Sequence, residues 1–125
     1  MKKIVIIGAS GHAKVVADII FARKKELNEE IEIVAFLDDN YENLGYKEIF
    51  EVPIIGTLKK IEDFDKGKYW FVIGVGNNHI RQKIFEQYSK LNYYTAVHPK
   101  TNIAKEVSIG AGTVIMANVI INAYS

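Results

Sequence analysis

The chain has 125 residues, of which 49% are hydrophobic, and its 16 Lys and Arg residues nearly balance its 15 Asp and Glu residues. This length and apolar content suffice for one domain with a buried core. The net charge of +1 leaves no basic surplus for nucleic acid binding, and the absence of Cys excludes disulfides and thiolate chemistry. No stretch reaches the roughly 18 apolar residues of a membrane span, so we expect a cytoplasmic protein without membrane or nucleic acid partners.

The first stretch of the chain predicts a strand, a tight loop, a helix and a second strand. The run Ile4–Ile7 is continuously apolar and β-branched, which is typical of a strand buried on both faces of a parallel sheet. Apolar residues then recur at helical spacing (Val15, Val16, Ile19 and Ile20), which predicts a helix over about 12–25. A second strand is predicted over 33–37, where it is followed by Asp38-Asp39-Asn40.

The next part of the chain repeats this alternation. The segment 52–64 predicts a short strand, a turn and a short helix, and a strongly apolar strand is predicted over 69–75. A second helix is predicted over about 79–91, with Ile80, Ile84, Phe85 and Tyr88 on one face, and a last strand over 93–97. Strands that alternate with helices favour a small Rossmann-like α/β domain over residues 1–97, with a parallel sheet and helices on both faces.

Residues 98–125 follow a different period. Isoleucines at 103, 109, 115 and 121 lie six residues apart, and a small or β-branched residue follows each of them by four positions. A six-residue repeat is typical of a hexapeptide parallel β-helix, and we expect the first, incomplete coil of a left-handed one here. A terminal β-hairpin is the alternative.

The segment GASGHA (8–13) connects the first strand to the first helix and predicts a phosphate site. Gly8 takes the tight-turn position of a dinucleotide-binding loop, Ser10 stands where that loop has its close-approach glycine, and Gly11 is a further permissive residue. The unpaired N–H groups of the helix N-terminus attract phosphate, and His12 can donate to a phosphate or sugar oxygen. A tight turn without a ligand is the alternative.

Polar residues at the ends of two other strands extend this predicted site. Carboxylates of Asp38 and Asp39 can accept hydrogen bonds from ribose hydroxyls or from a base N–H. The segment Gly76-Asn77-Asn78 follows the third predicted strand, at the edge of the sheet where α/β proteins bind ligands. The alternative for the Asp pair is a solvated turn. The alternative for the Asn pair is a helix cap, which does not exclude ligand binding. The three His residues show no metal-ligand spacing.

Five segments together resemble a known family. These are GASGHAKVV, FLDDN, VPIIGT, IGVGNNHIRQKI and AVHPKTNIAKEVSIGAGTVIMANVIIN, which occur in this order along essentially the whole chain. They are similar to the bacterial sugar O- and N-acetyltransferases of the sialic acid and bacillosamine pathways. The resemblance implies a Rossmann-like domain that binds a UDP- or CMP-linked sugar, followed by a left-handed β-helix that forms trimers and binds acetyl-CoA between subunits.

The resemblance also implies roles for individual residues. Gly8, Ser10, Gly11 and His12 are expected around the phosphates, Asp38 and Asp39 near the uridine or cytidine, and Gly76, Asn77 and Asn78 beside the sugar. The family's general-base His is expected beyond Ser125, so the 125 residues are expected to bind the nucleotide sugar without catalysing acetyl transfer. An NAD(P)-binding oxidoreductase or sensor domain, and a non-catalytic module that only oligomerises, are the alternative functions.

Overall fold

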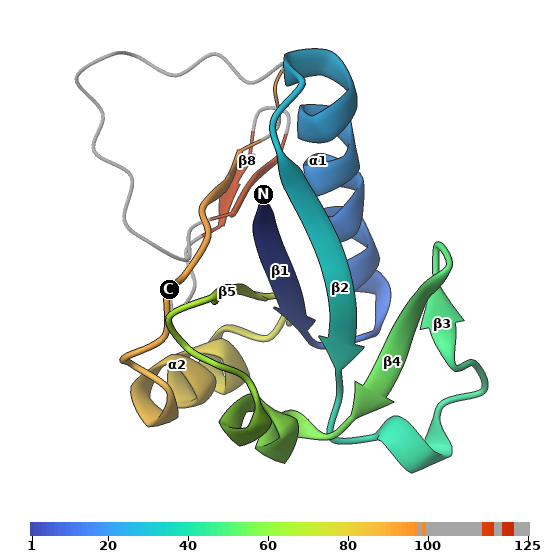
Figure 1. Cartoon of the computed structure of the whole chain (residues 1–125). Coiled ribbons are helices and arrows are strands. Elements are labelled where there is room, and N and C mark those ends of the chain that lie inside the picture. Colours follow the sequence, from blue (N-terminus) through green and yellow to red (C-terminus); the bar gives the residue numbers. More distant parts are fainter. Residues whose placement is uncertain (98, 100–113, 117–118, 122–125) are drawn as a thin grey trace.

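The computed structural model describes residues 1–97, 99, 114–116 and 119–121. Its helices, including two short 3₁₀ helices (η1 and η2), alternate with strands along the chain (Figure 1). The elements are β1 (Lys2–Ile7), α1 (Gly11–Leu27), β2 (Ile31–Leu37), η1 (Tyr41–Asn43), β3 (Glu48–Ile49), β4 (Val52–Gly56), η2 (Leu58–Asp63), β5 (Tyr69–Ile73), α2 (Asn78–Gln87), β6 (Ala96–Val97), β7 (Val114–Met116) and β8 (Val119–Ile121).

A five-stranded sheet in the order β3-β4-β2-β1-β5 forms the centre of the fold. The strands β4, β2, β1 and β5 pair in parallel, and only the two-residue β3 pairs antiparallel, with β4. The central strand β1 pairs with β2 on one side and with β5 on the other. The connection that carries α1 joins the neighbours β1 and β2, whereas the connection that carries η2 runs from β4 past β2 and β1 to β5. The order is that of a Rossmann-like half-sheet.

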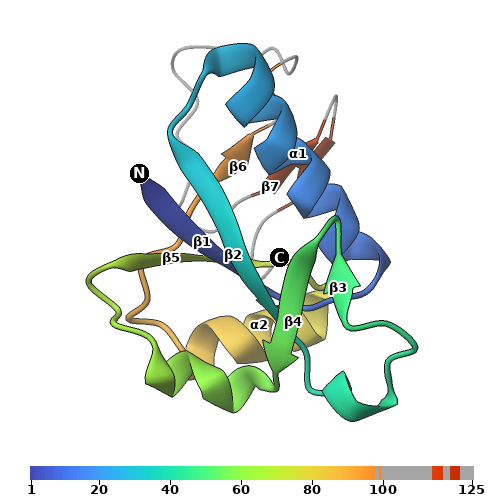
Figure 2. The same cartoon turned by 45° about the vertical axis from the view of Figure 1, so that its right-hand side comes forward.

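Each face of the sheet is covered by helices, because successive residues of a strand point to opposite faces. On one face, Ile4 and Ile6 pack with the buried side of α1 in one apolar cluster. On the other face, Val5 and Ile7 pack with Ile61 of η2 and with Ile84 of α2. Figure 2 shows α1 and α2 well apart in the molecule. The predicted α/β class, with a parallel sheet and helices on both faces, is confirmed.

The first helix begins one residue before its predicted start and continues two residues beyond its predicted end. It ends at Leu27 and is capped by Asn28, which has the left-handed φ of 52° that often terminates helices. Val16, Ile19 and Ile20 are buried as expected, but Val15 is 37% exposed. Ala13 and Ala17 complete the buried face instead, because they lie three or four positions from Val16 and Ile20.

The predicted strand over 93–97 is wrong as a single element. Tyr93 forms an isolated parallel bridge with Phe71 at the edge of the main sheet, whereas Ala96–Val97 forms β6 in a second sheet with β7. The second helix is also shorter than expected, since it ends at Gln87. The segment 52–64 forms the predicted short strand β4, a turn at Thr57 and the short helix η2.

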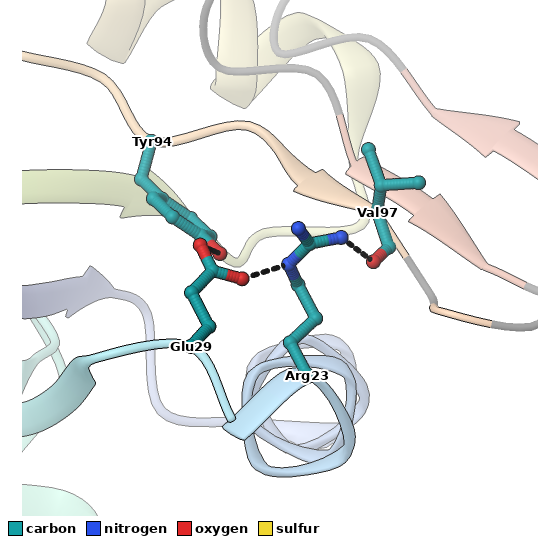
Figure 3. A network of polar contacts seen from close by, with 4 residues as sticks. All are labelled: Arg23, Glu29, Tyr94 and Val97. Carbon is teal, nitrogen blue, oxygen red and sulfur yellow. Dashed lines mark hydrogen bonds and ion pairs between the residues drawn. The ribbon is translucent and has the colours of Figure 1, made fainter. Parts of the chain in front are cut away.

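A partly buried polar network attaches β6 to the C-terminal part of α1 (Figure 3). The Arg23 guanidinium donates from Nη1 to the Val97 carbonyl oxygen (2.8 Å) and contacts the Glu29 carboxylate through Nε (2.5 Å). The second oxygen of Glu29 accepts from the Tyr94 hydroxyl (2.9 Å). These contacts hold β6 and Tyr94 beside the C-terminal part of α1.

Only two short segments of the predicted β-helix are described, β7 and β8. They pair antiparallel with each other, and β7 pairs in parallel with β6. Antiparallel pairing is the arrangement of a hairpin, which was the alternative, and differs from the sides of one β-helix coil, which do not pair among themselves. The remaining residues of the predicted coil, 100–113, 117–118 and 122–125, lie outside the described part, and the β-helix stays a prediction for 98–125.

Candidate functional site at the carboxyl edge of the sheet

The carboxyl ends of β1, β2 and β5 lie side by side because these strands are parallel neighbours (Figure 1). Ile7 is in register with Leu37 of β2 and with Ile73 of β5. The loops that follow these three residues therefore meet at one edge of the sheet. This is the edge at which open α/β sheets bind their ligands.

The glycine turn after β1 is shaped by close contact with β5. Gly8 has a φ of +114°, and a Cβ on it would lie 2.6 Å from the Gly74 carbonyl oxygen. Gly74 in turn leaves no room for a Cβ, which would lie 2.9 Å from the Cα of Ala13. These contacts agree with the predicted tight-turn role of Gly8, and they show Ala13 of α1 packed against Gly74, directly after β5.

The turn leads directly into α1, and the N-terminus of this helix faces the carboxyl edge of the sheet. Ser10 is the N-cap residue, is exposed, and forms no side-chain cap hydrogen bond within the described part of the chain. No acidic side chain lies in the first turn of α1. The N–H groups of that turn have no partners within the helix, and they carry the positive end of its dipole. This end is therefore free to receive an anion.

The two Asp residues after β2 have different partners. The Asp38 carboxylate accepts from the Ala9 amide through Oδ2 (2.9 Å) and from the Asn40 amide through Oδ1 (2.8 Å), so it ties the glycine turn to the end of β2. Asp39 is exposed and uses Oδ1 to accept from the Leu58 amide (3.0 Å). Each carboxylate oxygen has two acceptor sites, but Asp39 is the more open of the two to a ligand.

A cavity of about 370 Å³ lies directly over these loops. Four of the predicted site residues line it: Gly8, Ser10, Asp38 and Asp39. The remaining lining comes from the neighbouring loops and from one side of α2, namely Asn40, Leu58, Val75, Ile80, Lys83, Ile84 and Gln87. A second hollow of about 250 Å³, which includes Lys66 and Lys90, lies at the far end of α2 and shares only Gln87 with the first.

Sequence reasoning missed the contribution of α2 to this cavity. Ile80 and Ile84 were expected to share an apolar helix face, but Ile80 is 47% exposed and lines the cavity together with Lys83 and Gln87. The positions 80, 83, 84 and 87 follow the i, i+3, i+4, i+7 spacing of one helix stripe. A cation and an amide within an otherwise apolar stripe are the signal that could have identified this wall.

The predicted sugar-side residues do not line the described cavity. Asn77 caps α2, since its side-chain oxygen accepts from the Ile80 amide (3.0 Å). Asn78 accepts a hydrogen bond from the guanidinium of Arg81, which is only 3% exposed. The cap interpretation therefore holds for Asn77, and Asn78 positions a buried cation.

The other two predicted residues, Gly11 and His12, also lie outside the cavity lining. Gly11 is the first residue of α1, and no described atom lies within 4 Å of the Cβ position on it. His12 lies against Gly76, its ring is half-buried, and its Nε2 has no hydrogen-bond partner among the described residues. Burial, and secondarily the charge of Arg81, lower the pKa of His12 below its usual value of 6.5, which favours the neutral imidazole.

These features define a Rossmann-like α/β protein with a cavity of mixed polar and apolar lining at the carboxyl edge of its parallel sheet. Residues 3–88 match the model of the PglD N-terminal domain family, and the chain belongs to this family. The predicted family of bacterial sugar acetyltransferases, with bacillosamine among its pathways, is thereby confirmed.

Named relatives agree with this assignment. The UDP-N-acetylbacillosamine N-acetyltransferase of Bacillus subtilis (strain 168) is 35% identical, over 94% of this chain and 52% of its own length. The acetyltransferase domain of PglB from Neisseria gonorrhoeae FA1090, solved with acetyl coenzyme A, superimposes with a TM-score of 0.78 at 33% identity, over 93% of this chain and 53% of that one.

A second solved structure widens the range of relatives. It is a mutant of perosamine N-acetyltransferase from Caulobacter crescentus in complex with CoA and GDP-perosamine, with a TM-score of 0.76, 25% identity, and coverage of 94% of this chain and 52% of that one. The chain thus spans about half the length of the relatives that it matches.

Two features are absent from the described residues. None of their helices combines the length and apolar character needed to cross a bilayer. Nor do they hold any group of three or more His, Asp or Glu side chains placed to share a metal ion.

Proposed function

We propose that the cavity at the carboxyl edge binds a nucleotide-linked sugar, as the N-terminal part of an acetyl-CoA-dependent sugar O- or N-acetyltransferase. The observation that carries the proposal is the position of the cavity. It joins the open N-terminus of α1, at Gly8 and Ser10, to the carboxylates at the end of β2. The first can hold phosphate and the second can accept hydrogen bonds from a ribose or a base.

The names of the relatives support this substrate class. One acts on a UDP-linked sugar and another was solved with a GDP-linked sugar. We therefore propose a nucleoside diphosphate sugar as the ligand and keep a CMP-linked sugar as a further candidate. Acetyl-CoA is proposed as the co-substrate of the whole enzyme, and a homo-oligomer, a trimer in the family resemblance, as its assembly.

We propose further that the 125 residues bind this ligand without transferring an acetyl group. An acceptor amine or hydroxyl needs a base within hydrogen-bond reach. No His lines the cavity in the described part: His12 lies outside it with a buried Nε2, and His79 is exposed on α2. A transfer assay with acetyl-CoA and UDP-linked amino sugars should give no product, and measurable turnover would contradict this part of the proposal.

Thermal unfolding with added ligands tests the binding proposal. A ligand at ten times its Kd stabilises the folded state by about 1.4 kcal/mol, which corresponds to a rise in Tm of about 5 °C for a chain of this size. We expect such a rise with a UDP-, GDP- or CMP-linked sugar and little change with acetyl-CoA. A rise with NADH and none with any nucleotide sugar would refute the proposal in favour of a dinucleotide-binding domain.

The proposed assembly has its own measurement. Light scattering on the whole chain should give a mass above the 14.1 kDa of one chain. A monomeric mass at micromolar concentration would refute an oligomer for these 125 residues, and it would leave the ligand proposal to the thermal assay. An oligomer that responds to no nucleotide would instead favour a module that serves assembly alone.

A further inference from the structure

The carboxylates that line the cavity would repel a nucleoside diphosphate unless a cation also lies there. Asp38 and Asp39 both contribute carboxylates to the lining, and the ligand that we propose brings two negative charges of its own. The N-terminus of α1 offers only about half a positive charge. Like charges at close range oppose binding, so some side chain must supply a compensating charge.

Three neighbouring cations are unsuited to this role. His12 lies outside the cavity lining, and its lowered pKa favours the neutral ring. The Arg81 guanidinium is buried and donates to Asn78 on its own helix. Lys14, in the first turns of α1, places its ammonium 4.9 Å from the centre of the Tyr46 ring, and it does not line the cavity.

Lys83 is placed differently. Of the described residues that line the cavity, it alone carries a positive charge. It is exposed on α2, and it forms no ion pair or hydrogen bond with another described residue. It lies on the wall contributed by α2, one turn from Ile80 and one turn from Gln87, whereas the two carboxylates come from the loop after β2.

We infer that Lys83 is the phosphate-neutralising residue of this site and that it makes the cavity select charged nucleotides over neutral nucleosides. This inference rests on the proposed function. The ammonium on its flexible stem reaches a phosphate as a point charge and needs no fixed geometry. In this arrangement the carboxylates of Asp38 and Asp39 contact the nucleoside part of the ligand.

The test compares ligands that differ only in phosphate. Calorimetric titration of the whole chain with UDP, UMP and uridine is performed on the wild type, on Lys83→Gln, and on Lys83→Arg, which restores the charge. Lys90→Gln is the matched control, because Lys90 is an exposed lysine just beyond α2 that adjoins the other hollow. A charge-assisted contact in a partly exposed site predicts that Lys83→Gln weakens UDP binding about tenfold.

The pattern across ligands separates a charge role from a structural one. Lys83→Gln should weaken UMP binding less than UDP binding and leave uridine unchanged, and it should flatten the salt dependence of UDP binding. Lys83→Arg and Lys90→Gln should bind UDP within about twofold of the wild type. If GDP is the ligand that the wild type prefers, GDP, GMP and guanosine replace the uridine series.

Three other outcomes of these titrations would contradict the role of Lys83. Equal weakening of UDP and uridine by Lys83→Gln would show that the residue shapes the wall and does not neutralise phosphate. Unchanged UDP binding would refute the inference and leave the proposed function standing. A wild-type chain that binds neither these nucleotides nor any UDP-, GDP- or CMP-linked sugar would refute the proposed function and this inference with it.

Discussion

Replacing Gly8 by Ala tests whether the tight turn after β1 is as closely packed as the structure indicates. Two costs add at this position. An L-residue at a φ of +114° is strained, by about 1–3 kcal/mol. The new Cβ would lie 2.6 Å from the Gly74 carbonyl oxygen, and relieving such overpacking costs about 1–3 kcal/mol more. We therefore expect a loss of about 2–6 kcal/mol in the free energy of unfolding.

Gly11→Ala is the matched control, since it changes a glycine three residues away in the same loop sequence. No described atom lies within 4 Å of its Cβ position, and Gly11 is the first residue of α1. Alanine is favoured over glycine in helices by up to about 1 kcal/mol. The free energy of unfolding should therefore stay constant or rise slightly.

Urea unfolding followed by tryptophan fluorescence measures both variants. Trp70 is the one tryptophan of the sequence and lies half-buried on β5, next to the strand that carries the turn. The loss expected for Gly8→Ala corresponds to a fall in Tm of about 8 °C or more for a chain of this size. A Gly8→Ala protein as stable as the wild type, or a Gly11→Ala protein destabilised to the same degree, would refute the account of the turn.

Three further predictions concern the site and the polar network beside it. Asp38→Ala leaves the Ala9 amide without its partner and should cost about 1–3 kcal/mol in urea unfolding, whereas Asp39→Ala should mainly weaken nucleotide binding in titration; the reverse ranking would contradict the division between them. Tyr94→Phe removes a hydrogen bond to Glu29 and should cost about 1 kcal/mol. Burial raises the pKa of Tyr94, so the stabilisation that the neutral Tyr94 provides should be complete below about pH 10 and be lost as the pH rises further. The free energy of unfolding of the Phe variant should therefore fall less steeply at alkaline pH. The pKa of His12 is lowered in the folded state, so the free energy of unfolding should fall as the pH drops below 6.5 towards that lowered pKa. His12→Gln should make this loss of stability at acid pH smaller. An unchanged loss in the variant would contradict the burial of the ring.

The strand, turn and start of the first helix could be predicted from the sequence because their determinants are local. A continuous β-branched run reports burial on both faces, and a glycine followed by a helical apolar stripe marks the turn. The same local signals identified the short strand and 3₁₀ helix over 52–64. They also located Gly8, Ser10 and the Asp pair, since parallel strands bring the loops at their carboxyl ends together.

The roles within the site depended on contacts between distant segments. Only the packing of the turn against the end of β2 decided that Asp38 holds the Ala9 amide while Asp39 stays open. The stripe of α2 became a cavity wall because the sheet order places that helix over the edge that β1 and β2 share. A single sequence does not encode such distances, because they follow from how the elements pack.

The segment 93–97 illustrates the same limit. Its apolar residues favour a strand, and locally that expectation is sound. In the folded chain, Tyr93 stays at the edge of the main sheet, while Arg23, near the end of α1, holds the Val97 carbonyl and directs β6 towards β7. The sequence alone thus determined which segments are buried and extended, and the tertiary structure decided which partners they meet, because a strand's propensity is local and its neighbour is chosen by the whole fold.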